Sequence, residues 1–173
     1  MRRIALQVLR ENQLYAKLSK CSFYQRQIQY LGHIISEEGI SIDPSKIEAI
    51  NEWPTPKNVT EVRSFMGLVG YYRRFIEGFS RIAHPITSLQ RKGVQFEWTP
   101  KCEESFQKLK ELLISAPILR IVDPEKDCIV WTVACKEGLG GILTQEGHVI
   151  CYESRKLKEH EKNYARMTWS LLP

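Results

Sequence analysis

Carboxylates and thiols are the side chains from which this sequence would build catalytic chemistry, and their spacing assembles no site. The chain of 173 residues has three aspartates, Asp43, Asp123 and Asp127, and none are adjacent or separated by a single residue. Two-metal phosphoryl transfer needs carboxylates that hold two Mg²⁺ ions ~3.5 to 4 Å apart. The stretch IVWTVACKEGLGGILTQ at 129–145 predicts two strands around a tight turn, and its Val133 has no atom that binds a metal. We therefore expect no two-metal centre and no cofactor.

The cysteines give a second possible chemistry, which the sequence also disfavours. Five cysteines are far apart and form no C-x-x-C pair, which favours reduced, buried thiols over disulfides or a zinc site. Cys135 would need a base such as His148 or His160 to act as a nucleophile. A lone cysteine on a strand is more often a small buried hydrophobic residue, and nothing in the sequence places a histidine beside it. We assign no catalytic residue.

Binding residues are easier to find, because positive charge is confined to one part of the chain. Residues 1–114 hold 17 Lys and Arg against 12 Asp and Glu, whereas residues 115–173 hold 8 of each. Basic charge gathered on one segment raises the prospect of contact with phosphates. The candidates are arginines and tyrosines close to a pair of glycines, with the glycines themselves: Arg63, Gly67, Gly70, Tyr71, Tyr72, Arg73 and Arg74.

Two interpretations of these candidates stay open. Arginines reach phosphates and small residues let a helix approach a groove closely, which favours nucleic-acid contact. Glycines at this spacing are equally typical of tight packing between two helices of the same protein. The basic pairs Lys57 with Arg81 and Arg91 with Lys92 are more typical of a solvated surface.

The elements that would position these residues follow from turn, cap and periodicity signals. We predict a helix over 3–12, an extended segment over 14–23, and a β-hairpin of two runs within 28–42, in which Gly39 takes a positive φ in the turn SEEG. Helices are predicted from Asp43 and Pro44 to Pro54, from Asn58 to Gly78, and from Thr99 to before Pro117. Strands follow at 127–135, 139–145 and 148–153, with a last helix from about Glu159.

Composition sets the broad class of protein. With 43% hydrophobic and 26% charged residues, the chain suits one or two globular domains. No apolar run approaches the ~18 to 20 residues of a membrane span, and the N-terminal residues do not have the pattern of a secretory signal. We expect an intracellular protein of the cytoplasm or nucleus that does not contact membranes.

Several blocks of residues together resemble one family. In order they are LYAKLSKCSF, YLGHIIS, IDPSKIEAI, EVRSFMGLVGYYRRFI, FEW, and NY in the last predicted helix. They resemble the reverse transcriptase and RNase H region of gypsy-type LTR retrotransposon polyproteins and, more distantly, retroviral polymerases. The resemblance covers nearly the whole chain and implies an α+β fold.

The resemblance also implies three parts. Residues 1–42 would be the C-terminal remnant of a polymerase palm, with a β-hairpin like the primer grip, which holds the end of the primer. Residues 43–114 would be a helical thumb bundle that lies against a template and primer duplex. Residues 115–173 would be a truncated, RNase H-like α/β unit.

The catalytic positions of that family are missing or replaced here. The polymerase motif Y-x-D-D does not occur in this sequence. The first RNase H strand of the family reads roughly T-D-A-S, and its aspartate binds a metal, whereas Val133 stands at that position. The next family carboxylate is a glutamate at the position of Ser170. The resemblance therefore predicts a catalytically inactive copy, decayed or repurposed by its host.

Two functions remain as hypotheses. The first is weak, non-specific binding of an RNA–DNA hybrid or DNA duplex through the residues that match the grip and thumb: Gly32, His33, Arg63, Gly67, Tyr71, Arg73 and Arg74. His33 could equally be a half-exposed strand residue without a ligand. The second hypothesis is a host protein made from transposon sequence, which binds a protein partner through the thumb or through the exposed edge of the partial RNase H sheet, expected around Val149 and Cys151.

Overall fold

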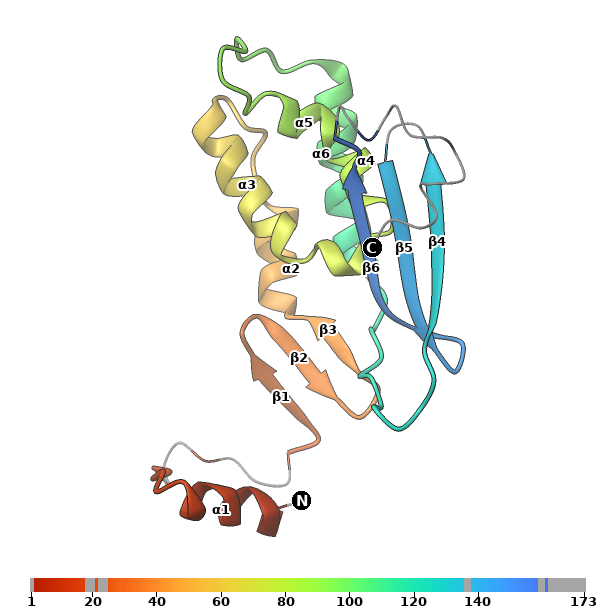
Figure 1. Cartoon of the computed structure of the whole chain (residues 1–173). Coiled ribbons are helices and arrows are strands. Elements are labelled where there is room, and N and C mark those ends of the chain that lie inside the picture. Colours follow the sequence, from red (N-terminus) through yellow and green to blue (C-terminus); the bar gives the residue numbers. More distant parts are fainter. Residues whose placement is uncertain (1, 18–20, 22–24, 136–137, 159–160, 162–173) are drawn as a thin grey trace.

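The computed structural model describes residues 2–17, 21, 25–135, 138–158 and 161. Two small antiparallel sheets lie against a group of helices, and the N-terminal helix α1 (Arg2–Glu11) stands apart from both sheets (Figure 1). The mixture of helices and sheets confirms the α+β class. No helix in the described ranges is long and apolar enough to cross a membrane.

The first sheet has three strands where the sequence predicted a two-stranded hairpin. Strands β1 (Gln27–Tyr30), β2 (His33–Ser36) and β3 (Ile40–Ile42) pair in the order β1-β2-β3. The predicted first run is divided by a two-residue turn in which Leu31 and Gly32 have φ values of 47° and 76°. Positive φ at both central residues matches the twist of a tight hairpin, but leucine gives no sequence signal for it. Gly39 has a φ of 140°, as predicted.

Three helices begin where their capping residues predicted. Asp43, Asn58 and Thr99 cap α2 (Pro44–Asn51), α3 (Val59–Tyr71) and α6 (Pro100–Ile114), respectively, with side-chain oxygens that accept backbone N–H bonds. The prediction that the second of these helices continues to Gly78 was wrong. The 3₁₀ turn η2 (Arg73–Phe75) follows α3. Gly78, with a φ of 64°, precedes the short helix α4 (Phe79–Ile82), and a second short helix, α5 (His84–Ser88), comes after it.

The hydrophobic core lies mainly between α2, α3, α5 and α6. Six of its members, Ile50, Val62, Phe65, Val69, Phe106 and Leu109, are at most 1% exposed, and Ile47 packs against them half-buried. Ile42 and Leu119 belong to the same core. Leu119 reaches it through an isolated bridge to Ile40, with N···O distances of 2.8 and 2.9 Å. The core therefore crosses both boundaries expected from the sequence, near residues 43 and 115.

The second sheet matches the three predicted strands. Strands β4 (Ile129–Cys135), β5 (Gly138–Gln145) and β6 (His148–Lys156) form an antiparallel meander in the order β4-β5-β6. Strand β6 faces η2 and α4, where the Ser80 hydroxyl donates to the Ser154 carbonyl oxygen at 2.6 Å. Nearly all of the predicted helix from Glu159 and half of the predicted extended segment lie outside the described residues.

Candidate nucleic-acid interface

One face of α3 is exposed and carries the residues that the sequence singled out. Arg63, Gly67 and Tyr71 are exposed at intervals of one helical turn, and Arg74 is exposed in the 3₁₀ turn that follows. Val62, Phe65 and Val69 bury the opposite face of α3 in the core. We call Arg63, Gly67, Tyr71 and Arg74 the α3 strip. Within the described part of the chain, neither arginine of the strip has an ion-pair partner.

The glycines of α3 do not serve packing between helices. A Cβ atom built at Gly67 or at Gly70 would meet no atom within 4 Å. Tight helix packing, one of the two interpretations left open by the sequence, requires a neighbouring backbone at that position, and none is present among the described residues. The missing side chain at Gly67 instead leaves the backbone of α3 open to the outside between Arg63 and Tyr71.

The turn between β1 and β2 lies beside the end of this strip. The Tyr71 hydroxyl donates a hydrogen bond to the Leu31 carbonyl oxygen at 2.8 Å, and the Tyr72 hydroxyl donates to the Gly32 carbonyl oxygen at 2.9 Å. His33 is half-buried, and its ring lies 5.3 Å from the Tyr71 ring centroid. The structure thus brings the predicted residues Gly32 and His33 next to Tyr71, although they come from different parts of the sequence.

Arg73 is placed differently from the other predicted arginines. Its guanidinium lies 3.6 Å from the Glu153 carboxylate of β6, and both side chains are about half exposed. An exposed ion pair of this kind contributes at most about 1 kcal/mol, so Arg73 remains available to a stronger anion. No sequence pattern predicts this pairing, because the two residues are distant along the chain.

Two titratable groups near the turn have shifted pKa values. Burial raises the pKa of Tyr72, so its hydroxyl stays protonated and able to donate. A hydrogen bond from the Gln29 amide, followed by one from the Ser45 backbone N–H, lowers the pKa of Asp43. Asp43 is therefore ionised at neutral pH while it caps α2.

Val133, at the position where the family resemblance predicts a metal-binding aspartate, lies on an exposed strand. The residue lies on β4 opposite Gly140, and its side chain is 70% exposed. No cluster of three or more metal-ligating side chains was found among the described residues. The second substituted position, Ser170, lies outside the described part of the chain.

Among the described residues, no strand pairs with the outer edge of β4, which we call the open edge of the second sheet. Ile129, Val130 and Trp131 are each more than half exposed, like Val133. The other outer strand, β6, packs against α4 and η2, and its Val149 carbonyl oxygen accepts a hydrogen bond from the Arg120 backbone N–H at 2.8 Å. The described cysteines Cys21, Cys102, Cys128 and Cys151 are free thiols. Cys128 is exposed, contrary to the expectation of buried cysteines, and the side chain of Cys135 is not described.

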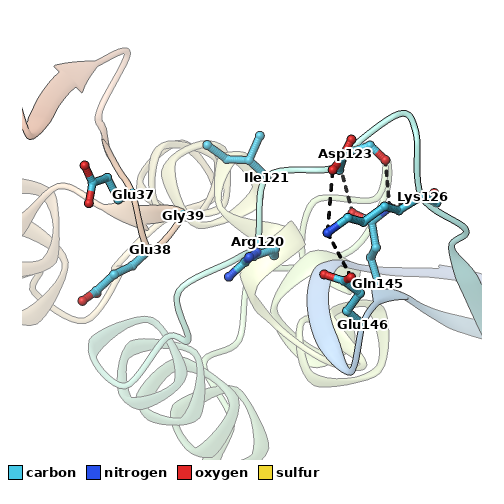
Figure 2. Close-up of a pocket in the computed structure, with 9 residues that line it drawn as sticks. All are labelled: Glu37, Glu38, Gly39, Arg120, Ile121, Asp123, Lys126, Gln145 and Glu146. Carbon is cyan, nitrogen blue, oxygen red and sulfur yellow. Dashed lines mark hydrogen bonds and ion pairs between the residues drawn. The ribbon is translucent and has the colours of Figure 1, made fainter.

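A polar hollow between the two sheets is organised by a structural glutamine (Figure 2). Gln145 is 3% exposed, and its amide accepts from the Asp123 backbone N–H and donates to the Asp123 and Lys126 carbonyl oxygens, each at 2.9 Å. Lys126 pairs with Glu146 at 2.9 Å. The polar groups of Asp123, Lys126, Gln145 and Glu146 bond to one another, and these bonds hold the loop before β4 in place. No sequence signal singled out Gln145.

Comparison with known proteins places the fold and the site in context. Residues 98–173 match the family described as the RNase H-like domain found in reverse transcriptase. The chain is 42% identical over 166 residues to the retrovirus-related Pol polyprotein from transposon 297 of Drosophila melanogaster, covering 95% of this chain and 16% of that protein. It is 33% identical over 165 residues to the Tf2-3 transposon polyprotein of Schizosaccharomyces pombe, covering 92% and 12%.

A shorter relative and two solved structures extend the comparison. An uncharacterized mitochondrial protein of Arabidopsis thaliana is 46% identical over 122 residues, which are 69% of this chain and 77% of that protein. The foamy viral protease-reverse transcriptase superposes with a TM-score of 0.79 both in complex with double-stranded DNA (22% identity, covering 95% of this chain and 30% of that one) and with an RNA/DNA hybrid (23% identity, 90% and 22%). At such identities the likeness shows the fold.

These matches define the class of protein. The helices with two small antiparallel sheets form the reverse transcriptase and RNase H-like fold. Residues 98–173 belong to the RNase H-like domain family found in reverse transcriptase, and the chain as a whole is similar to a part of retrotransposon polyproteins. It spans 16% and 12% of the lengths of the two transposon polyproteins.

Proposed function

We propose that the chain binds an RNA–DNA hybrid or DNA duplex through the α3 strip, without copying or cleaving it. The observation that carries the proposal is the open backbone at Gly67, with an exposed arginine one turn before it and an exposed tyrosine one turn after it. Glycine lets the helix backbone approach a groove, the tyrosine ring offers a flat surface to the sugar edge, and the arginines reach phosphates.

The neighbouring residues have graded roles in this proposal. Gly32 and His33 lie beside Tyr71 and extend the surface along the β1–β2 turn. Arg73 contributes less than Arg63 or Arg74, because it must first give up its pair with Glu153. The solved structures of the foamy viral relative in complex with double-stranded DNA and with an RNA/DNA hybrid support this class of ligand.

Binding through phosphates has a measurable signature. We expect no sequence preference, a Kd of ~10⁻⁴ to 10⁻⁶ M at physiological salt, and a steep loss of affinity as salt rises, because bound phosphates release counterions. The double variant Arg63→Ala/Arg74→Ala should weaken binding and flatten the slope of log Kd against log salt by roughly two contacts. Fluorescence anisotropy with a labelled hybrid at four or more salt concentrations measures both quantities.

Matched arginine and lysine variants control for net charge. Lys158→Ala removes one exposed positive charge just after β6, and Arg91→Ala removes one after α5. Each should leave the salt slope nearly unchanged. The effect of Arg73→Ala on the salt slope should be larger than that of these controls and smaller than that of Arg63→Ala. A strip variant that binds like the wild type with the same slope would overturn the proposal.

We further propose that the chain is not a nuclease. Valine at position 133 supplies no metal ligand on the strand where the family resemblance places an aspartate. The purified chain should therefore leave a labelled RNA–DNA hybrid intact with Mg²⁺ or Mn²⁺, on a denaturing gel beside an active ribonuclease H. Metal-dependent cleavage that follows the protein through two further purification steps would contradict this.

The three-part division of the chain stands as part of the proposal. A palm remnant over 1–42, a thumb over 43–114 and a truncated RNase H-like unit over 115–173 account for the two sheets and the helices between them. The shared core and the Ile40–Leu119 bridge tie the parts together. Limited proteolysis should therefore cut outside the segment that surrounds Leu119.

A second candidate function is favoured by the exposed strand β4. Its apolar side chains and open edge suit strand addition by a protein partner, as expected for a transposon-derived protein repurposed by its host. The sequence had placed this edge near Val149 and Cys151, but β6 is packed against helices and β4 is the open strand. Pull-downs with and without nuclease separate the two functions, because a β4 partner survives nuclease and is lost in Trp131→Lys.

A further inference from the structure

Two consecutive tyrosines bond two consecutive carbonyls of the β1–β2 turn, in different surroundings. Tyr71 reaches the Leu31 carbonyl oxygen and is 53% exposed, whereas Tyr72 reaches the Gly32 carbonyl oxygen and is 1% exposed. Water can replace an exposed hydrogen bond, but loss of a buried one leaves a polar group without that partner. The Tyr72 bond is therefore the one that can fix the place of the turn.

A single carbonyl joins three elements at this point. The Gly32 oxygen accepts from the Tyr72 hydroxyl at the end of α3 and also from the Asp43 backbone N–H at 3.1 Å. Asp43 is the N-cap of α2, and its side chain accepts from the Ser45 backbone N–H at 2.9 Å. The position of the turn is thus coupled to the start of α2 and to the end of α3 at once.

Position 32 has no room for a side chain while Tyr72 keeps its hydroxyl group. Gly32 has a φ of 76°, and a Cβ atom built there would stand 2.7 Å from the Tyr72 hydroxyl oxygen but 3.8 Å from the ring carbon that carries it. The neighbouring His33 ring lies 5.3 Å from the Tyr72 ring and 5.9 Å from the Phe75 ring. Of the Tyr72 atoms, only the hydroxyl oxygen would therefore be too close to a Cβ atom at position 32.

We propose that Tyr72 is a positioning residue of the nucleic-acid interface. Its buried hydroxyl holds the Leu31–Gly32 turn against the end of α3, so that the turn and the α3 strip meet a duplex as one preformed surface. This inference rests on the proposed function of the strip. Tyr71 touches the ligand, whereas Tyr72 acts through the turn and touches no ligand atom. A turn freed from Tyr72 must be ordered during binding, at a cost in affinity.

The matched pair Tyr72→Phe and Tyr71→Phe tests this division of roles. Tyr72→Phe keeps the ring and removes the buried bond, and it should weaken hybrid binding about 3- to 10-fold. The salt slope should stay at the wild-type value, because no phosphate contact is lost. Tyr71→Phe keeps the ring that faces the duplex and removes a bond that water can replace, so it should weaken binding less than Tyr72→Phe does. Amide hydrogen exchange without nucleic acid gives a second readout: the Asp43 N–H should exchange faster in Tyr72→Phe only.

A double-variant cycle isolates the contact itself. Gly32→Ala in the wild-type background pushes a Cβ atom against the Tyr72 hydroxyl, whereas in the Tyr72→Phe background that oxygen is gone. The positive φ of residue 32 affects both backgrounds equally and cancels. Gly32→Ala should therefore weaken hybrid binding by a smaller factor in Tyr72→Phe than in the wild type.

The outcomes separate this inference from the function on which it rests. If Arg63→Ala/Arg74→Ala weakens binding but Tyr72→Phe binds like the wild type, the strip stands and the positioning role is overturned. Additive effects of Gly32→Ala and Tyr72→Phe would also overturn it. If the wild-type chain itself binds no duplex, the proposed function fails and the positioning role fails with it.

Discussion

Gly67 lies inside a helix at a position where no packing contact requires glycine. Inside a helix, glycine is less favourable than alanine by ~0.5 to 1 kcal/mol, and packing usually justifies it. At position 67 no neighbouring atom would touch an added methyl group. The spacing of the glycines was visible in the sequence, but only the structure separates a packed glycine from an open one.

The first prediction at this scale follows directly. Gly67→Ala should stabilise the protein by ~0.5 to 1 kcal/mol, since alanine is the better helix former and meets no obstacle. The same methyl group should weaken duplex binding, because it stands between the helix backbone and the groove. Thermal unfolding and anisotropy on the same sample measure the two opposite effects.

Gly70→Ala is the matched control for that variant. It should stabilise α3 to a similar degree, but Gly70 is half-buried and lies off the line of Arg63, Gly67 and Tyr71, so binding should change less. If Gly67→Ala is more stable and still binds duplex as tightly as the wild type, the backbone at Gly67 does not approach a groove of the duplex.

Asp43 gives a prediction about pH. Because its hydrogen bonds lower the pKa of the folded carboxyl below the unfolded value of about 3.9, unfolding takes up protons in that range. The stability from Asp43 is therefore fully present above about pH 5 and is lost as the pH falls through about 4 and below. Asp43→Asn keeps a good N-cap without the charge.

The comparison of the two proteins isolates this contribution. Urea unfolding at several pH values should show the wild type more stable than Asp43→Asn at pH 7, with a difference that shrinks as the pH falls. Other carboxyl groups titrate in both proteins and cancel. A constant difference in stability down to pH 3 would mean that the ionised form of the Asp43 carboxyl does not stabilise the folded protein.

At the scale of elements, the sequence predicted what depends on local chemistry. Asp43, Asn58 and Thr99 located the starts of three helices, because capping uses residues within a few positions of each other. The end of α3 and the short helices α4 and α5 were missed. Their limits depend on burial of Tyr72, Phe75 and Ile86 against distant residues, which no local pattern reports.

The candidate site divides in the same way. The arginines, the glycines and Tyr71 could be named from sequence, since their types and helical spacing are local. The pairs Tyr72–Gly32 and Arg73–Glu153 could not, because each joins elements far apart in the chain. Outside the site, the contact of Lys110 with Trp53 could not be predicted for the same reason. Its ammonium group is held at 3.0 Å from the Trp53 carbonyl oxygen in a largely buried position that lysine rarely takes.

Helix α6 carries the prediction for this scale. Leu109 is 0% exposed in the middle of the core, so Leu109→Ala should lower the free energy of unfolding by ~2 to 5 kcal/mol. Leu112→Ala on the same helix, at a half-buried position, is the comparison and should cost clearly less. Chemical denaturation followed by tryptophan fluorescence measures both, and equal small losses would place this face of α6 outside the core.

At the scale of the whole molecule, the contacts run across the three proposed parts. The β1–β2 turn is bonded to α3, β3 is bridged to Leu119, and β6 is joined to α4 through Ser80 and Ser154. Each contact includes a hydrogen bond to a backbone carbonyl, which fixes angles more firmly than apolar packing alone. The parts are therefore expected to move together when a duplex binds.

The bridge between Ile40 and Leu119 has a consequence for the order in which the chain is made. A ribosome releases β3 long before it reaches Leu119, so the newly made first sheet keeps one edge of β3 without its final partner while the helices are being synthesised. Gly39 would not tolerate a side chain there, because a Cβ atom would collide with the Leu119 carbonyl oxygen. The segment around Leu119 thus closes the structure late, and force measurements on stalled nascent chains of increasing length should record a folding step only after that segment has left the exit tunnel.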